Sequence, residues 1–68
     1  MIAIQLNGEV HRVARGTTLQ ALVESLGLAS GQALALAVNR SVVPRQQWPD
    51  KPLASLDQIE IVRAIGGG

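Results

Sequence analysis

Three consecutive glycines close the sequence, which finishes Ala64-Ile65-Gly66-Gly67-Gly68. Glycine makes up about 7% of average protein sequence, so such a run at a chain end is rare by chance. Because glycine has no Cβ, a glycine tail can enter a narrow channel of another protein and bring its carboxylate beside a bound nucleotide. A frayed end or a cloning remnant explains the run less well. We therefore predict a domain of residues 1–63 followed by a flexible tail of residues 64–68.

The chemistry open to such a tail starts at the carboxylate of Gly68. A carboxylate is a poor electrophile, but its transfer to AMP gives an acyl-adenylate whose carbonyl a persulfide can attack. The product is a thiocarboxylate, whose sulfur stays anionic near neutral pH and attacks an electrophilic carbon in a second enzyme. In this scheme an adenylating partner uses ATP and magnesium, and the chain itself needs no cofactor.

The residues beside the reacting end would enter any protein that receives the tail. We therefore predict partner contacts at Arg63, Ala64, Ile65, Gly66 and Gly67.

Side-chain chemistry elsewhere is sparse. The sequence contains no cysteine, which excludes a disulfide, a thiolate metal site and a cysteine nucleophile. His11 has no carboxylate or hydroxyl partner placed by spacing, and we interpret it as a solvent-facing strand residue. Asp57 and Glu60 point differently and make a poor metal pair, so we predict no metal site and assign Asp57 to a turn.

Three further residues have a structural interpretation that we weigh against a functional one. Arg45 and Trp48 suit a partner surface, but a tryptophan flanked by prolines is more often part of the packing. Asn39 is most simply a residue that tolerates a left-handed turn.

Composition narrows the class of protein. The chain has 68 residues, 47% apolar and 16% charged, with a net charge of +1, which is typical of one small folded domain. The basic residues are scattered with almost no aromatic residues between them, so we expect no nucleic-acid partner. No stretch approaches the roughly 20 apolar residues that cross a bilayer, and residues 1–6 lack the basic region and long apolar region of a secretion signal, so we expect none. We expect a cytoplasmic protein with no membrane partner.

The first half of the sequence predicts a hairpin and a helix. Residues 1–6 alternate, Asn7-Gly8 suits a tight turn, and residues 9–13 return. Thr17 and Gln20 resemble a capping box, and Gly27 is a helix-ending residue. The apolar residues between them recur on one helical face: Leu19, Leu22, Val23 and Leu26.

The second half predicts three strands. After a loop at Gly31, residues 34–38 alternate, residues 39–41 turn, and residues 42–43 form a short strand that ends at Pro44. Residues 45–48 suit a single 3₁₀ turn, the segment to Leu56 is irregular, and residues 58–63 form the last strand.

This order predicts an α+β fold of two layers, with a mixed sheet of four to five strands and one main helix on one face. The first and last strands are the most regular, so we place them side by side at the centre. That arrangement is the β-grasp, and it buries one set of residues together: Ile2, Ile4, Ile59, Ile61, Leu19, Leu22 and Leu26.

Four segments of the sequence carry a family resemblance: Ile4-Gln5-Leu6-Asn7-Gly8, Ala37-Val38-Asn39-Arg40-Ser41-Val42-Val43-Pro44-Arg45 with Trp48, Asp57-Gln58-Ile59-Glu60-Ile61, and the diglycine end. With these segments the whole chain resembles the ThiS family of ubiquitin-like sulfur carriers of thiamin biosynthesis. This resemblance implies that Gly68 is adenylated by an E1-like enzyme, thiocarboxylated from a persulfide sulfur donor, and then gives its sulfur to thiazole synthase. Gly66 is a departure, since some members carry alanine there, but it leaves the terminal pair intact.

Other functions fit the tail less closely. The small subunit of molybdopterin synthase is similar in fold and chemistry, although the run from Asn39 to Trp48 favours the thiamin branch. A ubiquitin-like modifier joined to lysines, or an interaction module with an inert tail, remains open at this point. We expect the chain to be a protein cosubstrate and not an enzyme.

Overall fold

The computed structural model describes residues 1–28 and 34–63. The predicted loop at Gly31 and the predicted tail of residues 64–68 lie outside the described residues. Five strands form one sheet in the order β2-β1-β5-β3-β4, which confirms the predicted mixed sheet. In chain order the elements are β1 (Ile2–Leu6), β2 (Glu9–Val13), α1 (Leu19–Ser25), β3 (Leu34–Val38), β4 (Ser41–Val42), the 3₁₀ helix η1 (Arg45–Asp50) and β5 (Gln58–Arg63).

The β1–β2 hairpin forms where the Asn7-Gly8 dipeptide predicts it. Both residues have positive φ, 50° and 86°, as a two-residue hairpin turn between twisted strands requires. The strands pair from Ile2 with Val13 to Leu6 with Glu9. This register puts Ile2 and Ile4 on one face of the sheet, where both are buried.

Helix α1 begins one residue later than the capping box predicted. Its N-cap is Thr18, whose hydroxyl accepts a hydrogen bond from the amide of Ala21 at 3.1 Å. The Thr17–Gln20 capping box is therefore wrong: the Gln20 side chain instead donates to Glu24, one turn further along. Thr17 and Thr18 each carry a hydroxyl that can cap a helix, so the sequence alone did not show which of the two is the N-cap.

The helix ends at the predicted glycine. Gly27 has a φ of 75° and its amide donates to the carbonyl of Glu24. The amide of Leu28 donates to the carbonyl of Val23, which completes a Schellman motif.

The segment after β3 differs slightly from its prediction. Asn39 and Arg40 make the turn with φ of 52° and 70°, and β4 begins already at Ser41. Val43, expected in the strand, lies just beyond it, although its amide still donates to the carbonyl of Leu36 at 2.9 Å. Helix η1 runs to Asp50, longer than the single turn expected.

A tight turn precedes β5. The carboxylate of Asp57 accepts from the amide of Ala54 at 2.8 Å, which confirms Asp57 as a turn residue. Leu56 has a φ of 71°, and its amide donates to the carbonyl of Ala3 at 2.7 Å. The turn therefore sets the start of β5 directly beside β1.

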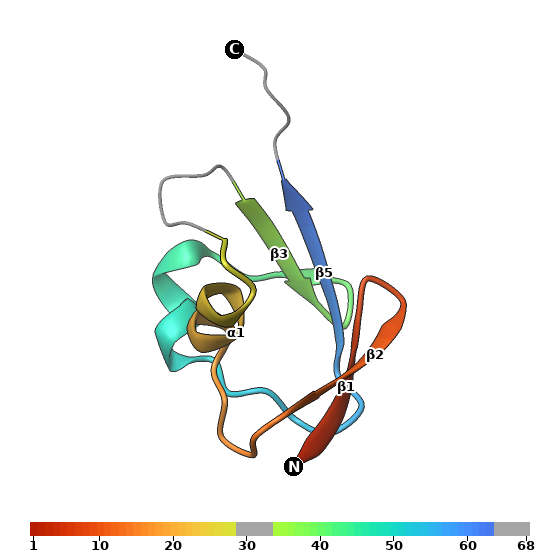
Figure 1. Ribbon diagram of the computed structural model, residues 1–68. Helices are drawn as coiled ribbons and strands as arrows, with labels where there is room; N and C mark the ends of the chain where they lie inside the picture. Colours follow the sequence, from red (N-terminus) through yellow and green to blue (C-terminus); the bar gives the residue numbers. More distant parts are fainter. Residues whose placement is uncertain (29–33, 64–68) are drawn as a thin grey trace.

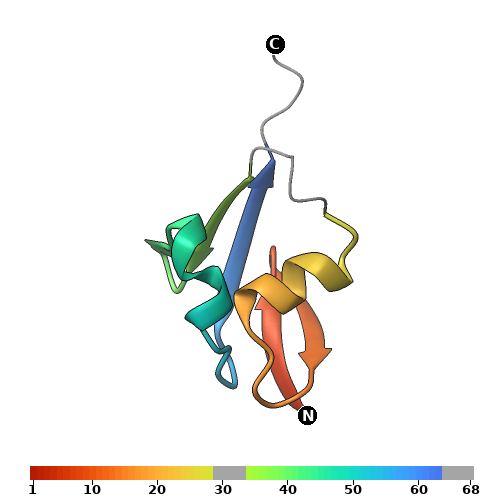
Figure 2. The same ribbon diagram turned by 90° about the vertical axis from the view of Figure 1, so that its left-hand side faces the viewer.

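Strand β5 fills the centre of the sheet, as predicted. It runs parallel to β1 and antiparallel to β3. Figures 1 and 2 show α1 and η1 on one side of the sheet, while no helix formed by residues 1–28 or 34–63 lies on the other side. We call these the covered face and the open face.

The core lies between the covered face and the two helices. Most of the predicted residues are in it, with Ile61 and Leu26 only partly buried against it. Its buried members are Ile2, Ile4, Val13, Leu19, Leu22, Val23, Leu36, Val38, Val43, Trp48, Leu53 and Ile59. Among the described residues, no helix is long and apolar enough to span a bilayer.

Candidate functional site at the end of the last strand

The only predicted tail-proximal residue that the structure describes is Arg63. It is exposed, it is the last residue of β5, and it lies opposite Leu34 of β3. In Figure 1 the end of β5 stands clear of the β1–β2 hairpin, with β3 beside it. The other predicted site residues, Ala64, Ile65, Gly66, Gly67 and Gly68, lie outside the described residues.

Strand β5 is held at its start by the turn after β3. The amide of Asn39 donates to the carbonyl of Gln58 at 2.7 Å, and its side-chain oxygen accepts from the amide of Gln58 at 2.9 Å. The Asn39 amide group also donates to the Asp57 carboxylate at 3.0 Å. The left-handed turn predicted for Asn39 is confirmed, and its side chain adds two hydrogen bonds that turn propensity did not predict.

A second asparagine holds β5 from the opposite flank. The amide of Asn7 donates to the carbonyl of Ile59 at 2.9 Å. Its side-chain oxygen accepts from the amide of Ile61 at 2.9 Å, and its side-chain nitrogen lies 3.4 Å from the carbonyl oxygen of Ile61. Asn7 thus continues the β1–β5 ladder with its side chain after β1 has ended. Sequence reasoning assigned Asn7 only to the hairpin turn.

The open face carries exposed apolar side chains that sequence reasoning did not single out. Val10, Val42 and Val62 are 73%, 74% and 63% exposed. The strand registers place all three on the face away from the helices, and Val62 directly precedes Arg63. The sequence did contain a signal for these valines, because they occupy the alternate strand positions that lie between the predicted buried ones.

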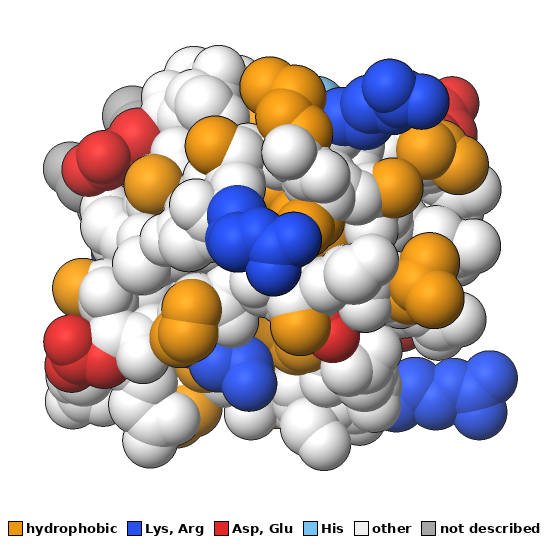
Figure 3. All heavy atoms as spheres, turned by 90° about the horizontal axis from the view of Figure 1, so that it is seen from below, with side chains coloured by type: hydrophobic (Ala, Val, Ile, Leu, Met, Phe, Trp, Pro, Cys, Tyr) orange, Lys and Arg blue, Asp and Glu red, His pale blue; other side chains and the backbone are white. Residues whose placement is uncertain are grey.

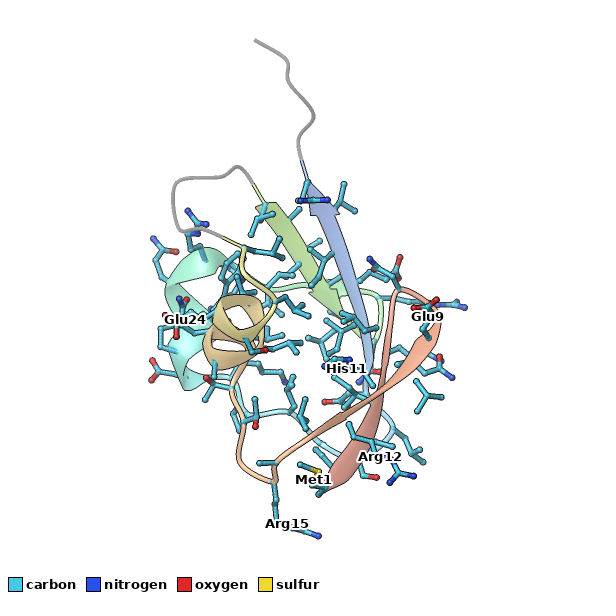
Figure 4. All side chains as sticks on the ribbon, in the orientation of Figure 1. Met1, Glu9, His11, Arg12, Arg15 and Glu24 are labelled. Atoms are coloured by element: carbon cyan, nitrogen blue, oxygen red, sulfur yellow. The ribbon has the colours of Figure 1, made fainter. Side chains whose placement is uncertain are left out.

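The prediction for His11 was only partly right. It lies opposite Ile4 in the β1–β2 register, so its side chain is on the covered face and is half-buried. It lines a shallow depression between β2 and α1, together with Ala21 and Ser25 (Figure 4). Helix α1 is too short to cover the whole face of the sheet, so the imidazole ring of His11 lies at the edge of the area that the helix covers.

Trp48 is part of the core, as expected. It is 2% exposed, and its indole N–H donates to the carbonyl of Val43 at 2.9 Å. The Arg45 guanidinium lies over the ring at 5.0 Å from its centroid, a cation–π contact. Packing therefore explains the tryptophan and its arginine neighbour.

Charge and metal chemistry do not define another site in the described part of the chain. There, no group of three or more His, Cys, Asp or Glu residues is placed to hold a metal ion. Seen from the end of the molecule opposite Arg63, the basic side chains stand apart from one another (Figure 3).

Comparison with known proteins identifies the family. The model of the ThiS family matches residues 4–68, which includes the final glycine. The chain belongs to the ThiS family. The sulfur carrier protein ThiS of Escherichia coli K12 is 37% identical over 65 residues, covering 96% of this chain and 97% of that protein. This ThiS-family chain is a sulfur carrier protein of thiamin biosynthesis.

Longer relatives contain a similar segment. A thiazole synthase of Magnetococcus marinus is 45% identical over 65 residues, which are 96% of this chain but 20% of that protein. The chain thus spans about a fifth of that relative's length.

The structural comparison supports the fold. The crystal structure of the thiamine biosynthesis protein ThiS from Geobacter metallireducens superposes with a TM-score of 0.83 at 22% identity, covering 98% of this chain and all of that one. The predicted ubiquitin-like β-grasp is therefore confirmed.

Proposed function

We propose that the carboxylate of Gly68 is the sulfur-bearing group of this carrier. The observation that carries the proposal is the match to the ThiS family through the last glycine of the sequence. An E1-like adenylyltransferase uses ATP and magnesium to form the acyl-adenylate of Gly68, with release of pyrophosphate. A persulfide donor then attacks the carbonyl, AMP leaves, and cleavage of the acyl disulfide by a reducing thiol frees the thiocarboxylate.

Thiazole synthase is the proposed acceptor of the sulfur. Support comes from relatives that bear that name and contain a segment similar to this chain. Besides the Magnetococcus protein, a thiazole synthase of Paramagnetospirillum magneticum is 33% identical over 63 residues, which are 19% of its length. A carrier segment within the same polypeptide as a thiazole synthase indicates that the two act together. The thiamin branch is accordingly preferred to molybdopterin synthesis.

The proposed division of labour follows the fold. Residues 1–63 are the docking domain, and residues 64–68 are the tail that reaches the partner's active site. Five extended residues span at most about 17 Å. The partner must therefore contact the domain close to Arg63 while it holds Gly68, and residues 63–67 are the proposed contacts. Because the donor of the adenylyl group is ATP, we place the reaction in the cytoplasm.

The test is an intact mass measurement after incubation with the E1-like enzyme, ATP, magnesium, a persulfide donor and a reducing thiol. We expect a mass gain that corresponds to replacing one oxygen by sulfur, and fragmentation should map it to Gly68. The matched control is a chain that ends at Gly67; it should fold, because the core lies within residues 1–63, and it should gain no sulfur. Sulfur on the shortened chain, or none on the full chain with an active enzyme, would contradict the proposal.

A further inference from the structure

Strand β5 changes its neighbours along its length. At its start it lies between β1 and β3, but it pairs with β1 only at Gln58 and Ile59. Its pairing with β3 continues to Arg63. In the described part of the chain β5 therefore begins as a central strand and ends as an edge strand, as Figure 1 shows. An edge strand presents backbone groups that another strand can pair with.

The backbone groups of Arg63 point to that free edge. The backbone amide of Asn39 donates to the carbonyl of Gln58, so the carbonyl of Gln58 faces β3, and in an antiparallel ladder this orientation recurs at every second residue. The N–H and C=O groups of Ile59, Ile61 and Arg63 consequently face away from β3. The carbonyl of Ile59 indeed accepts from the amide of Asn7, on the side of β1.

Asn7 occupies this edge immediately before Arg63. Its side-chain oxygen accepts a hydrogen bond from the amide of Ile61 at 2.9 Å, and its side-chain nitrogen lies 3.4 Å from the carbonyl oxygen of Ile61. A strand arriving from outside therefore cannot pair with Ile61 unless it displaces Asn7. The first backbone groups free to accept it are those of Arg63.

The occupant of the edge follows from the length of the tail. This step rests on the proposed function, in which an adenylating enzyme holds Gly68. Five residues separate Arg63 from the end of the sequence, a reach of about 17 Å at most. The enzyme's active-site channel must then open beside the end of β5, where an extended chain entering it lies along the channel wall.

We propose that the adenylating enzyme adds a strand to β5 at Arg63, and that Asn7 sets the register of this pairing by closing the edge at Ile61. Backbone hydrogen bonds give such strand addition its affinity. A fixed register delivers the carboxylate of Gly68 at one depth. A slip of two residues toward Ile61 would carry it about 7 Å beyond its place.

The first experiment removes the N–H of Arg63. Arg63→Pro deletes this donor. Arg63→Ala is the matched control, because it loses the arginine side chain but keeps the backbone N–H. Proline is tolerated in a strand where its N–H would face outward, and it favours the extended conformation that Val62 already has. Thermal unfolding should be similar for the two variants. We expect kcat/KM for carrier-dependent pyrophosphate release to be about tenfold lower in Arg63→Pro than in Arg63→Ala, because an acceptor on the enzyme stays unpaired.

Equal kcat/KM for the two variants would overturn the strand addition and favour docking through Val10, Val42 and Val62 of the open face. If Arg63→Pro unfolds early, a semisynthetic chain with an ester in place of the amide at Arg63 removes the same N–H without the ring. Its kcat/KM is then compared with that of the all-amide chain, with the same two outcomes.

The second experiment tests the register. Asn7→Gly keeps the left-handed turn but frees the backbone of Ile61, so misregistered complexes should form. We expect kcat for adenylation to fall several-fold with little rise in KM. The control is Asn39→Gly, which loses side-chain bonds to β5 on the opposite flank without opening this edge, and its kcat should stay that of the wild type. Equal kcat for the two glycine variants would refute the role of Asn7.

Failure of this inference is distinct from failure of the proposed function. A wild-type chain that is never adenylated contradicts both. A wild-type chain that is adenylated and thiocarboxylated, while the paired variants behave alike, contradicts the strand addition alone.

Discussion

Both faces of the sheet carry valines, but these valines differ in what they do. Val38 on the covered face is 5% exposed, whereas Val42 on the open face, across the turn from it, is 74% exposed. The covered face packs under α1 and η1, whereas no helix in the described part of the chain lies over the open face (Figure 2). The difference shows that stability is concentrated on one face, so the other face and the strand edge beside it are free for partners.

The largest expected effect is on the covered face. Trp48→Ala should lower the free energy of unfolding by about 3–5 kcal/mol, because it leaves a large cavity and frees the carbonyl of Val43. Urea denaturation followed by circular dichroism measures this. A loss below about 1 kcal/mol would mean that the ring is not the centre of the core.

A matched pair of valines tests the comparison directly. Val38→Thr places a hydroxyl in the core and should cost about 1–3 kcal/mol. Val42→Thr has the same shape change on the open face and should alter stability by less than about 0.5 kcal/mol. Equal losses in urea denaturation would break the distinction between the two faces.

A smaller effect is expected at the start of the helix that covers one face. Thr18→Ala removes the N-cap hydroxyl and should cost about 1 kcal/mol. Thr17→Ala removes a hydroxyl with no capping role, and its change should stay within about 0.5 kcal/mol. The reverse order in thermal unfolding would restore the capping box that the sequence predicted.

The smallest effect has the opposite sign. Leu56 has a φ of 71°, a left-handed backbone conformation that is unfavourable for a residue with a side chain. Its side chain is 78% exposed, so burial does not compensate for this strain. Leu56→Gly should stabilise the fold by about 0.5–1 kcal/mol, the relief of strain minus the entropy of glycine. A lower melting temperature would show that the leucine contributes packing which its exposure does not reveal.

Periodicity predicted most of the fold, because each strand buries alternate residues and the helix buries one stripe. The central pairing of β1 with β5 followed from their regular alternation. What periodicity could not specify were features decided by single hydrogen bonds: Thr18 rather than Thr17 at the cap, and the start of β4 at Ser41. The half-buried position of His11 depends on where α1 stops, which its own strand does not encode.

The candidate site was predicted less completely. The glycine run and the family resemblance predicted a tail, which lies outside the described residues, and Arg63 lies at the end of β5 as predicted. The roles of Asn7 and Asn39 on the two flanks of β5 were missed, because turn propensity explains an asparagine without any reference to where its side chain reaches. Such contacts join residues 54 and 19 positions apart, and only the assembled sheet brings them together.

The central place of β5 also governs the timing of folding. Strands β1 and β3 each pair with β5, so neither half of the sheet can join the other until the last strand has been synthesised. Contacts between such distant segments form late and slowly compared with local ones. A nascent chain therefore acquires its finished sheet only as the residues leading to the tail emerge. Strand β5, which completes the sheet, ends at Arg63, so an enzyme that bound the end of β5 as proposed would select carriers that have completed folding.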